Sequence, residues 1–492
     1  MISSTTQAPS HNGLLVGDCR TTLPTLPEGT FHMVVTSPPY FRLRAYDGDE
    51  DGVEWPEVRY RPMRDLPEVV VPAGRTALGQ EEEVTHYVGH LVEVMREVRR
   101  VLRPDGVLWL NLGDTYTSGS RDKHYEDQKS AGRKGGRPQG PQSGDLIGVP
   151  WRVALALQAD GWVLRTDVVW AKRNMIPESV TGWRWEQCRV KVRAGRRGQQ
   201  VYGARSSPGR PQSDWSHDVN LSAPEWAPCP GCDKCRANGG LVLRRGSWRP
   251  TRSHEAVLML TRSERYFSDG ESVREPHNLQ YVQRRKSLSG DKSQTGRMDR
   301  RPVMSMRYDG VPLGNPDGRN QRDVWFLASY PSKIRHFAMM PPLLVERCLL
   351  SGPEHVCAAC GTPWVRIVDR QTYREASGER PMDKTQCNVV RAGWRQGGPT
   401  RTTRGHRPAC ACGVGSVPPR VLDPFVGAGT VAGVAEVLGW CWTGCELSPN
   451  YAEIVPQRIA EVRTALRPTR DKRTPRKEPQ AASPLRQLGF VV

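Results

Sequence analysis

Apolar positions along the chain fall into short continuous runs and into stretches with helical spacing. Leu14–Val16 and Phe31–Val35 are apolar runs that end in turns, which is typical of buried parallel strands. His90–Leu102 has apolar residues at helical spacing and ends at the turn Arg103–Gly106, and Val107–Asn111 follows as another strand. This strand–helix–strand order predicts an α/β fold with a parallel sheet.

The same rhythm returns later in the chain. The pattern predicts a helix over Pro150–Ala159, one or two strands over Trp162–Trp170, and then, near the end, a strand over Arg420–Asp423, a helix over Val431–Leu438, a strand over Trp440–Glu446 and a helix over Asn450–Val462. Periodicity weakens between 177 and 321, apart from one apolar island, His254–Leu260, that reads as a strand.

Composition divides the chain further. We expect the sheet to be built from residues 1–176 and 413–466, with an irregular region at 177–321, a capping segment at 322–356 and a cysteine-bearing insertion at 357–412. Residues 117–144 are rich in Gly, Ser, Lys and Arg and are expected to form a mobile basic loop. Residues 467–492 are rich in proline and charge and are expected to be a disordered basic tail.

The 492-residue chain is strongly basic, with 71 Lys and Arg against 52 Asp and Glu, a formal charge of +19. A surface of scattered cations would explain some of this excess, but its concentration in loops favours a nucleic-acid partner. The N-terminus carries no apolar signal-peptide core and no stretch is long enough to span a bilayer, so we expect a cytoplasmic protein. Thirteen cysteines then indicate thiols and metal ligands rather than disulfides.

A glycine-rich turn, Asp423–Thr430, closes one predicted strand and opens a helix. Gly427 and Gly429 would allow the backbone to approach a ligand, although many glycine turns are purely structural. Glu446 follows at the end of the next strand, where an acid can accept hydrogen bonds from two ribose hydroxyls. A nucleoside cofactor is expected. Asp423 favours S-adenosylmethionine over NAD, since a carboxylate would repel a pyrophosphate but pair with an ammonium group.

A second turn, Ser37-Pro38-Pro39-Tyr40, follows a predicted buried strand. It could be an ordinary proline-rich turn, but its groups suit an amino substrate. The Ser37 hydroxyl and the Pro38 carbonyl could accept the two hydrogens of one NH₂ group, and Tyr40 offers a ring for stacking a base. Transfer to a ring carbon would instead require a cysteine thiolate, and no cysteine lies beside this turn.

With both turns and their order in view, the chain resembles the site-specific DNA amino-methyltransferases, the N4-cytosine/N6-adenine family, β class. The resemblance covers most of the chain outside the loops, in the segments Gly17-Asp18, Thr36–Tyr40, Leu102–Asp114, Ile147–Arg152, Gly161–Lys172, Ser253–Phe267, Arg322–Trp325 and Leu422–Tyr451. It implies a doubly wound, mostly parallel Rossmann-like sheet and methyl transfer from S-adenosylmethionine to double-stranded DNA.

The resemblance also assigns roles to residues. Asp18 matches an acid that contacts the cofactor adenine, Glu446 the ribose-binding acid, and His336 a segment that packs over the cofactor. Trp170 and Lys172 fall where the family lines its target-base pocket, although Trp170 could equally be a core aromatic at a strand end. The methionine-binding turn corresponds here to Phe425, Gly427, Gly429 and Thr430, and we expect Asp423 and Pro424, just before them, to bind the cofactor as well.

Ser37 at the first position of the catalytic turn is commoner among cytosine-N4 enzymes, so we expect cytosine N4 as the target and adenine N6 as the alternative. Methylation of RNA or of a protein amide is less favoured, because Asn-Pro-Pro-Tyr is commoner in those enzymes. An inactive, zinc-stapled DNA-binding protein is a further alternative. A target base must be flipped out of the duplex, and the Arg- and Trp-rich region 177–321 is expected to hold the distorted DNA.

Two groups of cysteines have the spacing of metal ligands. Cys357, Cys360, Cys410 and Cys412 form two close pairs that resemble zinc-ribbon knuckles, with His355 or Cys387 as possible substitutes. A second group, Cys229, Cys232 and Cys235, lacks a fourth ligand, for which Cys188 and His217 are candidates. We expect both groups to hold structural zinc and to pin loops of the target-recognition region.

Overall fold

The computed structural model describes nine stretches of the chain and separates it into two compact units. One unit comprises Met1–Asn174 together with His254–Val492, and the other comprises Met175–Ser253. The described residues are 12–43, 52–117, 144–174, 182–193, 225–276, 318–330, 332, 339–371 and 400–466. The expected basic loop and basic tail fall almost wholly outside these stretches.

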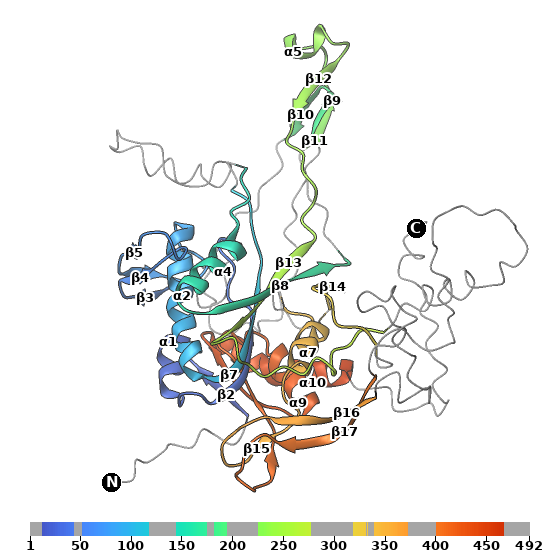
Figure 1. The fold of residues 1–492 in the computed structure, drawn as a ribbon. Coiled ribbons are helices and arrows are strands. Elements are labelled where there is room, and N and C mark those ends of the chain that lie inside the picture. The colour runs from blue at the N-terminus through green and yellow to red at the C-terminus, as the bar shows by residue number, and fades with distance from the viewer. Residues whose placement is uncertain are drawn as a thin grey trace, which may run out of the picture. The chain divides into compact units, whose positions relative to one another are not determined.

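The larger unit is built on an eight-stranded sheet (Figure 1). Five of its seven neighbouring strand pairs are parallel, and β13 alone runs antiparallel to both of its neighbours. This confirms the predicted mostly parallel sheet. In spatial order the strands are β1 (Gly13–Val16), β20 (Cys441–Glu446), β19 (Arg420–Asp423), β2 (Phe31–Thr36), β7 (Leu102–Leu112), β13 (His254–Thr261), β8 (Val163–Lys172) and β14 (Val324–Leu327).

Successive residues of the central strands point alternately into two hydrophobic cores, one on each face of the sheet. Helices therefore cover both faces, as in a doubly wound fold. In β7, Leu108 and Leu110 point into one core, whereas Val107 and Trp109 point into the other. One core contains α2 (Val84–Val101) and α4 (Val149–Ala159), and the other contains α7 (Pro342–Leu350), α9 (Thr430–Leu438) and α10 (Pro449–Leu466). Burial on both faces explains why these strands read as continuous apolar runs.

Two boundaries differ from the sequence-based expectation. Helix α2 begins at Val84, six residues before the expected start at His90. Strand β7 begins at Leu102, immediately after the helix, and continues through Arg103–Gly106, which was expected to be a turn. Parallel pairing with β2 extends the strand across this proline-containing segment, with an irregular register. Among the described helices, none combines the length and apolar character needed to cross a membrane.

Short strands that the sequence pattern did not predict lie between β2 and α2. They form two antiparallel pairs, and Tyr60 and Val71 from one of them pack in the same core as α2. Before them come the one-turn helix α1 (Cys19–Thr22) and a 3-10 turn (Leu23–Thr25). The pairs are β3 (Val53–Trp55) with β6 (Gly74–Thr76), and β4 (Val58–Tyr60) with β5 (Val69–Val71).

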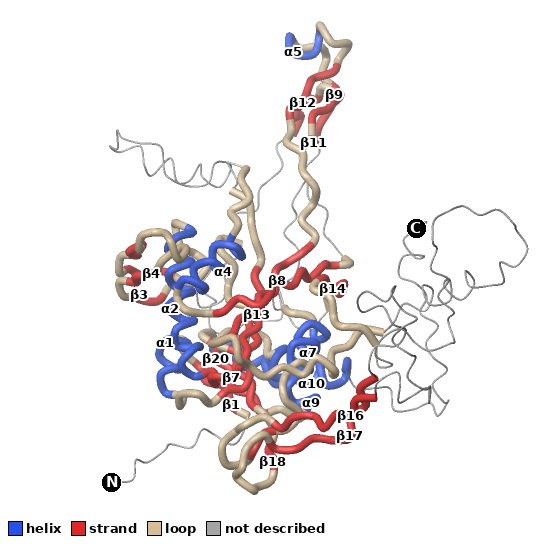
Figure 2. The backbone as a smooth tube through the Cα atoms, viewed as in Figure 1, coloured by secondary structure: helices blue, strands red, loops and turns tan. Residues whose placement is uncertain are grey.

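The cysteine-bearing insertion also belongs to the larger unit. It consists of a long hairpin, β16 (Trp364–Gln371) with β17 (Thr400–Pro408), and a short pair, β15 (Val356–Cys357) with β18 (Ser416–Val417). Figure 2 shows β16 and β17 side by side.

The smaller unit contains two antiparallel strand pairs and a single short helix among its described residues. Strands β9 (Trp183–Gln187) and β12 (Leu241–Arg245) form one pair, and β10 (Arg189–Arg193) and β11 (Glu225–Pro228) form the other. Helix α5 (Asp233–Arg236) connects β11 to β12. The expected region 177–321 therefore contains this unit and, separately, strand β13 of the central sheet.

Candidate active site and cysteine tetrads

The two turns identified in the sequence line one cavity at the carboxyl ends of the central strands. Residues 37–40 and 423–428 both form its wall, and the cavity occupies about 1140 Å³ measured out into its open mouth. From β2 the chain proceeds to β7 on one side, whereas from β19 it proceeds to β20 on the other. Such a reversal of strand order is where open α/β sheets bind ligands.

A buried hydrogen bond connects the two turns directly. The hydroxyl of Thr36, at the end of β2, donates to Oδ1 of Asp423, at the end of β19, over 2.6 Å. The backbone N–H of Phe425 donates to the same oxygen over 3.1 Å. Burial raises the pKa of Asp423 to about 7, although both hydrogen bonds act to lower it. This carboxyl is therefore poised to pair with a cationic group that enters the cavity.

The glycine turn has the conformation that its sequence requires. Gly427 and Gly429 adopt φ values of +53° and +93°, which residues with a side chain rarely adopt. A Cβ on Gly429 would also lie 2.8 Å from Val455 Cγ1 of α10. The Gly427 N–H donates to Oε2 of Glu446 over 2.8 Å, and the Ser448 N–H donates to Oε1 over 3.0 Å. The Glu446 carboxylate is thus held at the cavity wall beside the turn.

Asp18 lines the same cavity beyond the end of β1. It caps α1 by accepting from the Arg20 N–H, and its carboxylate forms an ion pair with the Arg20 guanidinium at 2.5 Å. The guanidinium lies 4.0 Å from the ring centre of Trp55, which also lines the cavity. This corner therefore combines an acid with an indole ring that lies against Arg20 and stacks on His90, with ring centres 3.9 Å apart.

The Ser37–Tyr40 turn is held by helix α2 and strand β7. The Tyr87 hydroxyl of α2 donates to the Pro39 carbonyl over 2.9 Å. The ring of Tyr40 lies so close to the backbone after β7 that a Cβ on Gly113 would be 2.5 Å from two of its ring carbons. Tyr40 is 5% exposed. The turn is therefore rigid on its protein side and open on its cavity side.

Two polar residues that the sequence pattern did not identify contact the Ser37–Tyr40 turn. The Tyr40 hydroxyl lies 2.7 Å from Glu255 Oε2, 2.7 Å from Asn111 Nδ2 and 3.1 Å from Ser37 Oγ. The other oxygen of Glu255 forms an ion pair with Lys172. Asn111 is a single amide in the apolar run of β7, and Glu255 is an acid at the start of an apolar strand, which are the signals that could have identified them.

The expected target-base residues separate in the structure. Trp170 is buried in the core that contains α7, and its Nε1 donates to the Leu327 carbonyl over 3.1 Å, so it does not line the cavity. Its core position fits the structural alternative given for it above. Lys172 reaches the Tyr40 network through Glu255. The expected capping residue His336 lies outside the described residues.

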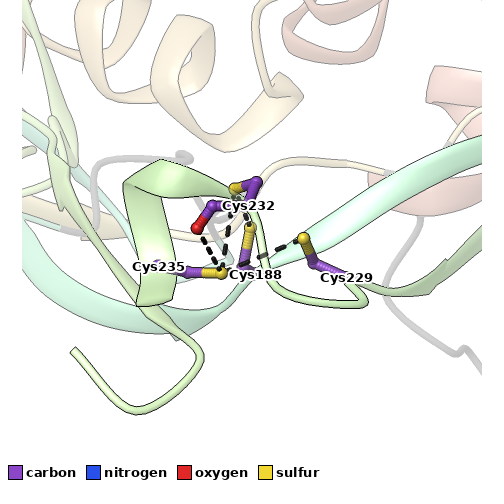
Figure 3. A group of neighbouring side chains, drawn as sticks. All are labelled: Cys188, Cys229, Cys232 and Cys235. Atoms are coloured by element: carbon purple, nitrogen blue, oxygen red, sulfur yellow. Dashed lines mark hydrogen bonds between the residues drawn. The ribbon is translucent and has the colours of Figure 1, made fainter. Parts of the chain in front are cut away.

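The incomplete cysteine group gains its fourth member from the start of the smaller unit. The sulfur atoms of Cys188, Cys229, Cys232 and Cys235 converge (Figure 3), and all lie within 4.8 Å of one another. Three of the sulfur–sulfur distances are 3.7, 3.7 and 3.9 Å. Tetrahedral zinc with bonds of about 2.3 Å requires about 3.8 Å between sulfurs. The tetrad therefore fits zinc.

The second tetrad assembles from the four cysteines predicted for it. The sulfur atoms of Cys357, Cys360, Cys410 and Cys412 lie within 4.8 Å of one another. A hydrogen bond with the Thr362 hydroxyl lowers the pKa of Cys360, whereas hydrogen bonds with Cys360 and Cys410 raise the pKa of Cys412. A set of four thiols with no open position is suited to structural rather than catalytic zinc.

This second tetrad is fixed to the amino ends of the central strands, on the side of the sheet away from the cavity. His32, at the start of β2, lies 2.9 Å from the Gly361 carbonyl through Nε2 and accepts from the Arg420 N–H through Nδ1. Arg103, in β7, donates to the Cys360 carbonyl. The Cys357 tetrad therefore contacts central strands of the larger unit. The expectation that it pins a loop of the target-recognition region stays a prediction.

Three comparisons place the chain among known proteins. The sequence model of the family described as DNA methylase, N6_N4_Mtase, matches residues 31–354. Type II methyltransferase M.XycI from Xanthomonas campestris pv. cyanopsidis is 30% identical over 450 residues, covering 91% of this chain and 87% of that protein. Type II methyltransferase M.SmaI from Serratia marcescens is 27% identical, covering 91% and 90%.

Among solved structures, PvuII DNA methyltransferase (cytosine-N4-specific) aligns with 93% of each chain, at 12% identity and a TM-score of 0.40.

Proposed function

From its membership of the DNA methylase family, which the matches to residues 31–354 and to M.XycI establish, we propose that this chain transfers a methyl group from S-adenosylmethionine to the exocyclic N4 of cytosine in duplex DNA. The observation that supports this proposal best is the single cavity shared by the catalytic and cofactor turns, joined by the Thr36–Asp423 hydrogen bond.

The cofactor half of the cavity has groups that match S-adenosylmethionine. The Asp423 carboxyl would pair with the ammonium of the methionine portion, and the turn at Gly427 and Gly429 would accommodate its chain. Glu446 would accept from the ribose hydroxyls, and Asp18 would lie nearest the adenine. When bound, the cofactor supplies an electrophilic methyl group on a sulfonium centre. The protein contributes position and charge rather than a covalent intermediate.

The acceptor half of the cavity suits an amino group. An exocyclic nitrogen is a weak nucleophile because its lone pair is delocalised into the ring. Hydrogen bonds from its two hydrogens to the Ser37 hydroxyl and the Pro38 carbonyl would favour a pyramidal nitrogen with an available lone pair. The base would reach this position only after it is flipped out of the duplex, which costs a few kcal/mol.

The smaller unit is the proposed DNA contact. It carries fourteen Lys and Arg against six Asp and Glu. Trp183 and Trp185 lie on one face of β9 and are 67% and 52% exposed, and the Arg245 guanidinium lies 5.1 Å from the Trp183 ring. A two-stranded ribbon can enter a DNA groove, where arginine can contact bases and aromatic rings can stack between them.

The choice of cytosine over adenine rests on Ser37, and adenine N6 is the alternative. Purified protein, S-adenosylmethionine labelled in the methyl group and unmethylated duplex DNA provide the test. After digestion to nucleosides, we expect the label in N4-methylcytosine. Label in N6-methyladenine would reverse the choice of base, and label in RNA but not DNA would contradict the proposed substrate. Loss of transfer in Pro38→Ala with normal cofactor affinity would identify the turn as catalytic.

A further inference from the structure

The hydrogen bonds around Tyr40 have directions that chemistry fixes. A carboxylate can only accept, so the Tyr40 hydroxyl must donate its hydrogen to Oε2 of Glu255. The amide nitrogen of Asn111 can only donate, and it lies within 2.9 Å of Glu255 Oε2 and 2.7 Å of the Tyr40 oxygen. The reverse orientation of this amide would place its oxygen against a carboxylate.

The hydroxyl of Tyr40 is therefore unable to donate to Ser37. Its hydrogen is directed to Glu255, and the Asn111 amide occupies one of its two lone pairs. The Ser37 hydroxyl lies 3.1 Å away and can pair with Tyr40 only as the donor. Ser37 consequently directs its hydrogen towards Tyr40. Asn111 Nδ2 lies 3.5 Å from Ser37 Oγ and can take one lone pair, which leaves the other for the cavity, whose wall Ser37 forms.

Further contacts hold Glu255 in this arrangement. Lys172 forms an ion pair with Oε1, so Oε2 is the oxygen that faces Tyr40 and Asn111. The Lys172 ammonium lies 4.9 Å from the ring centre of Trp170, whose Nε1 is anchored to the Leu327 carbonyl. The Glu255 side chain is 13% exposed. The carboxylate is thus fixed by Lys172 at one oxygen and by Tyr40 and Asn111 at the other.

We infer that Glu255 is a positioning and specificity-determining residue that makes Ser37 a hydrogen-bond acceptor towards the target base. A flipped base with an exocyclic amine can donate to such a group. A base with a carbonyl at the same position would place two acceptors face to face, and its buried oxygen would lack a partner. The site would therefore admit cytosine and reject uracil or thymine. This inference rests on the proposed function but holds equally for adenine N6.

The discriminating variant is Glu255→Gln. Glutamine keeps the size of the side chain, but its amide can present either an N–H or an oxygen to Tyr40. The Tyr40 hydroxyl could then donate to Ser37, and the Ser37 hydroxyl could turn its own hydrogen into the cavity. Glu264→Gln is the matched control, because this exposed residue lies in the turn after the same strand.

The experiment measures binding rather than turnover. The target position is first mapped in DNA methylated by the wild-type protein, and duplexes with cytosine or uracil at that position are then titrated in the presence of S-adenosylhomocysteine. We expect the wild type and Glu264→Gln to prefer cytosine by about tenfold or more, and Glu255→Gln to lose most of that preference. Affinity for S-adenosylhomocysteine should not change.

A second variant distinguishes orientation from simple support of the fold. Tyr40→Phe removes the same chain of hydrogen bonds, so the losses of preference in Tyr40→Phe and Glu255→Gln should not add in the double variant. An unchanged preference in folded Glu255→Gln would overturn the inference. Failure of the wild type to methylate any DNA would instead overturn the proposed function, so the two failures are distinguishable.

Discussion

Each of the two cysteine tetrads has four thiols, but the surroundings of the two differ. The Cys357 tetrad is fixed to the larger unit through His32 and Arg103. Arg366 of its hairpin also forms an ion pair with Asp269 at 2.6 Å. In the smaller unit, by contrast, the apolar side chains that are buried among the described residues are Cys188 and Cys235 themselves. One tetrad therefore extends an existing core, whereas the other replaces one.

This difference assigns the two metal sites different consequences. A small unit without a hydrophobic core depends on its metal for folding, since binding energy and folding energy are then the same. An insertion anchored to a large sheet has other contacts that hold it when the metal is lost. The smaller unit should therefore unfold in an all-or-none way when its metal is lost, whereas the larger unit should lose stability gradually.

The largest effect is expected from Cys235→Ser, because Cys235 is fully buried in the smaller unit. Zinc content should fall from two ions per chain to one, since each tetrad would hold one ion. Methyl transfer to DNA should fall at least about 100-fold with the loss of the DNA contact, while affinity for S-adenosylhomocysteine stays within about twofold. Elemental analysis, labelled transfer and calorimetry measure these quantities.

Suppose that Cys235→Ser loses one zinc ion while its larger unit stays folded. Methyl transfer that persists in this variant would show that the smaller unit is not the DNA contact. A parallel fall in cofactor affinity would show that the two tetrads are not independent.

An intermediate effect is expected from Cys357→Ser. Its zinc content should also fall to one ion per chain. The main result should be a decrease in the melting temperature of the larger unit, on the order of 5 °C, with transfer activity retained at low temperature. The reason is that His32 and Arg103 would lose their partners at the amino ends of β2 and β7. Thermal unfolding monitored by circular dichroism tests this, with Cys235→Ser as the reciprocal control.

Burial lowers the pKa of His32 to about 4. A His with a depressed pKa stabilises the fold above its ordinary value of 6.5 and loses that contribution as the pH falls towards 4. If Cys357→Ser exposes this ring, the stability of the larger unit should fall less steeply as the pH is lowered between those two values. An unchanged acid transition would mean that the ring stays buried without the metal.

The sequence predicted those parts of both regions that depend on local pattern. Strand β19 was placed at Arg420–Asp423 because a short apolar run is bounded there by turn residues. Spacing identified seven of the eight tetrad cysteines, and Cys188 was one of the candidates left open for the eighth. Glu255 and Asn111 escaped because their role depends on contacts with Tyr40 across 215 and 71 residues. The contact between the Cys357 tetrad and His32 was not predicted for the same reason, since nothing in the local sequence identifies His32 as its partner.

The smallest effect concerns Asp423, three residues along β19 from Arg420, whose N–H donates to His32. Its pKa of about 7 in the cofactor-free protein exceeds the ordinary 3.8, so its contribution to stability is complete below 3.8 and is lost as the pH rises through 7. An ammonium group would favour the ionised form. Cofactor affinity should therefore weaken below pH 7, on the order of tenfold per pH unit, with proton release on binding.

Calorimetry in buffers of different ionisation enthalpy measures that proton release. Asp423→Asn should remove the pH dependence and weaken binding, and Cys235→Ser should keep the wild-type profile because its tetrad lies in the other unit. Cys357→Ser provides the critical comparison, since the path from its tetrad through His32 to β19 leads to this carboxyl. A shifted profile in Cys357→Ser alone would show that the insertion helps to position the cofactor site, whereas identical profiles in both cysteine variants would confine its role to stability.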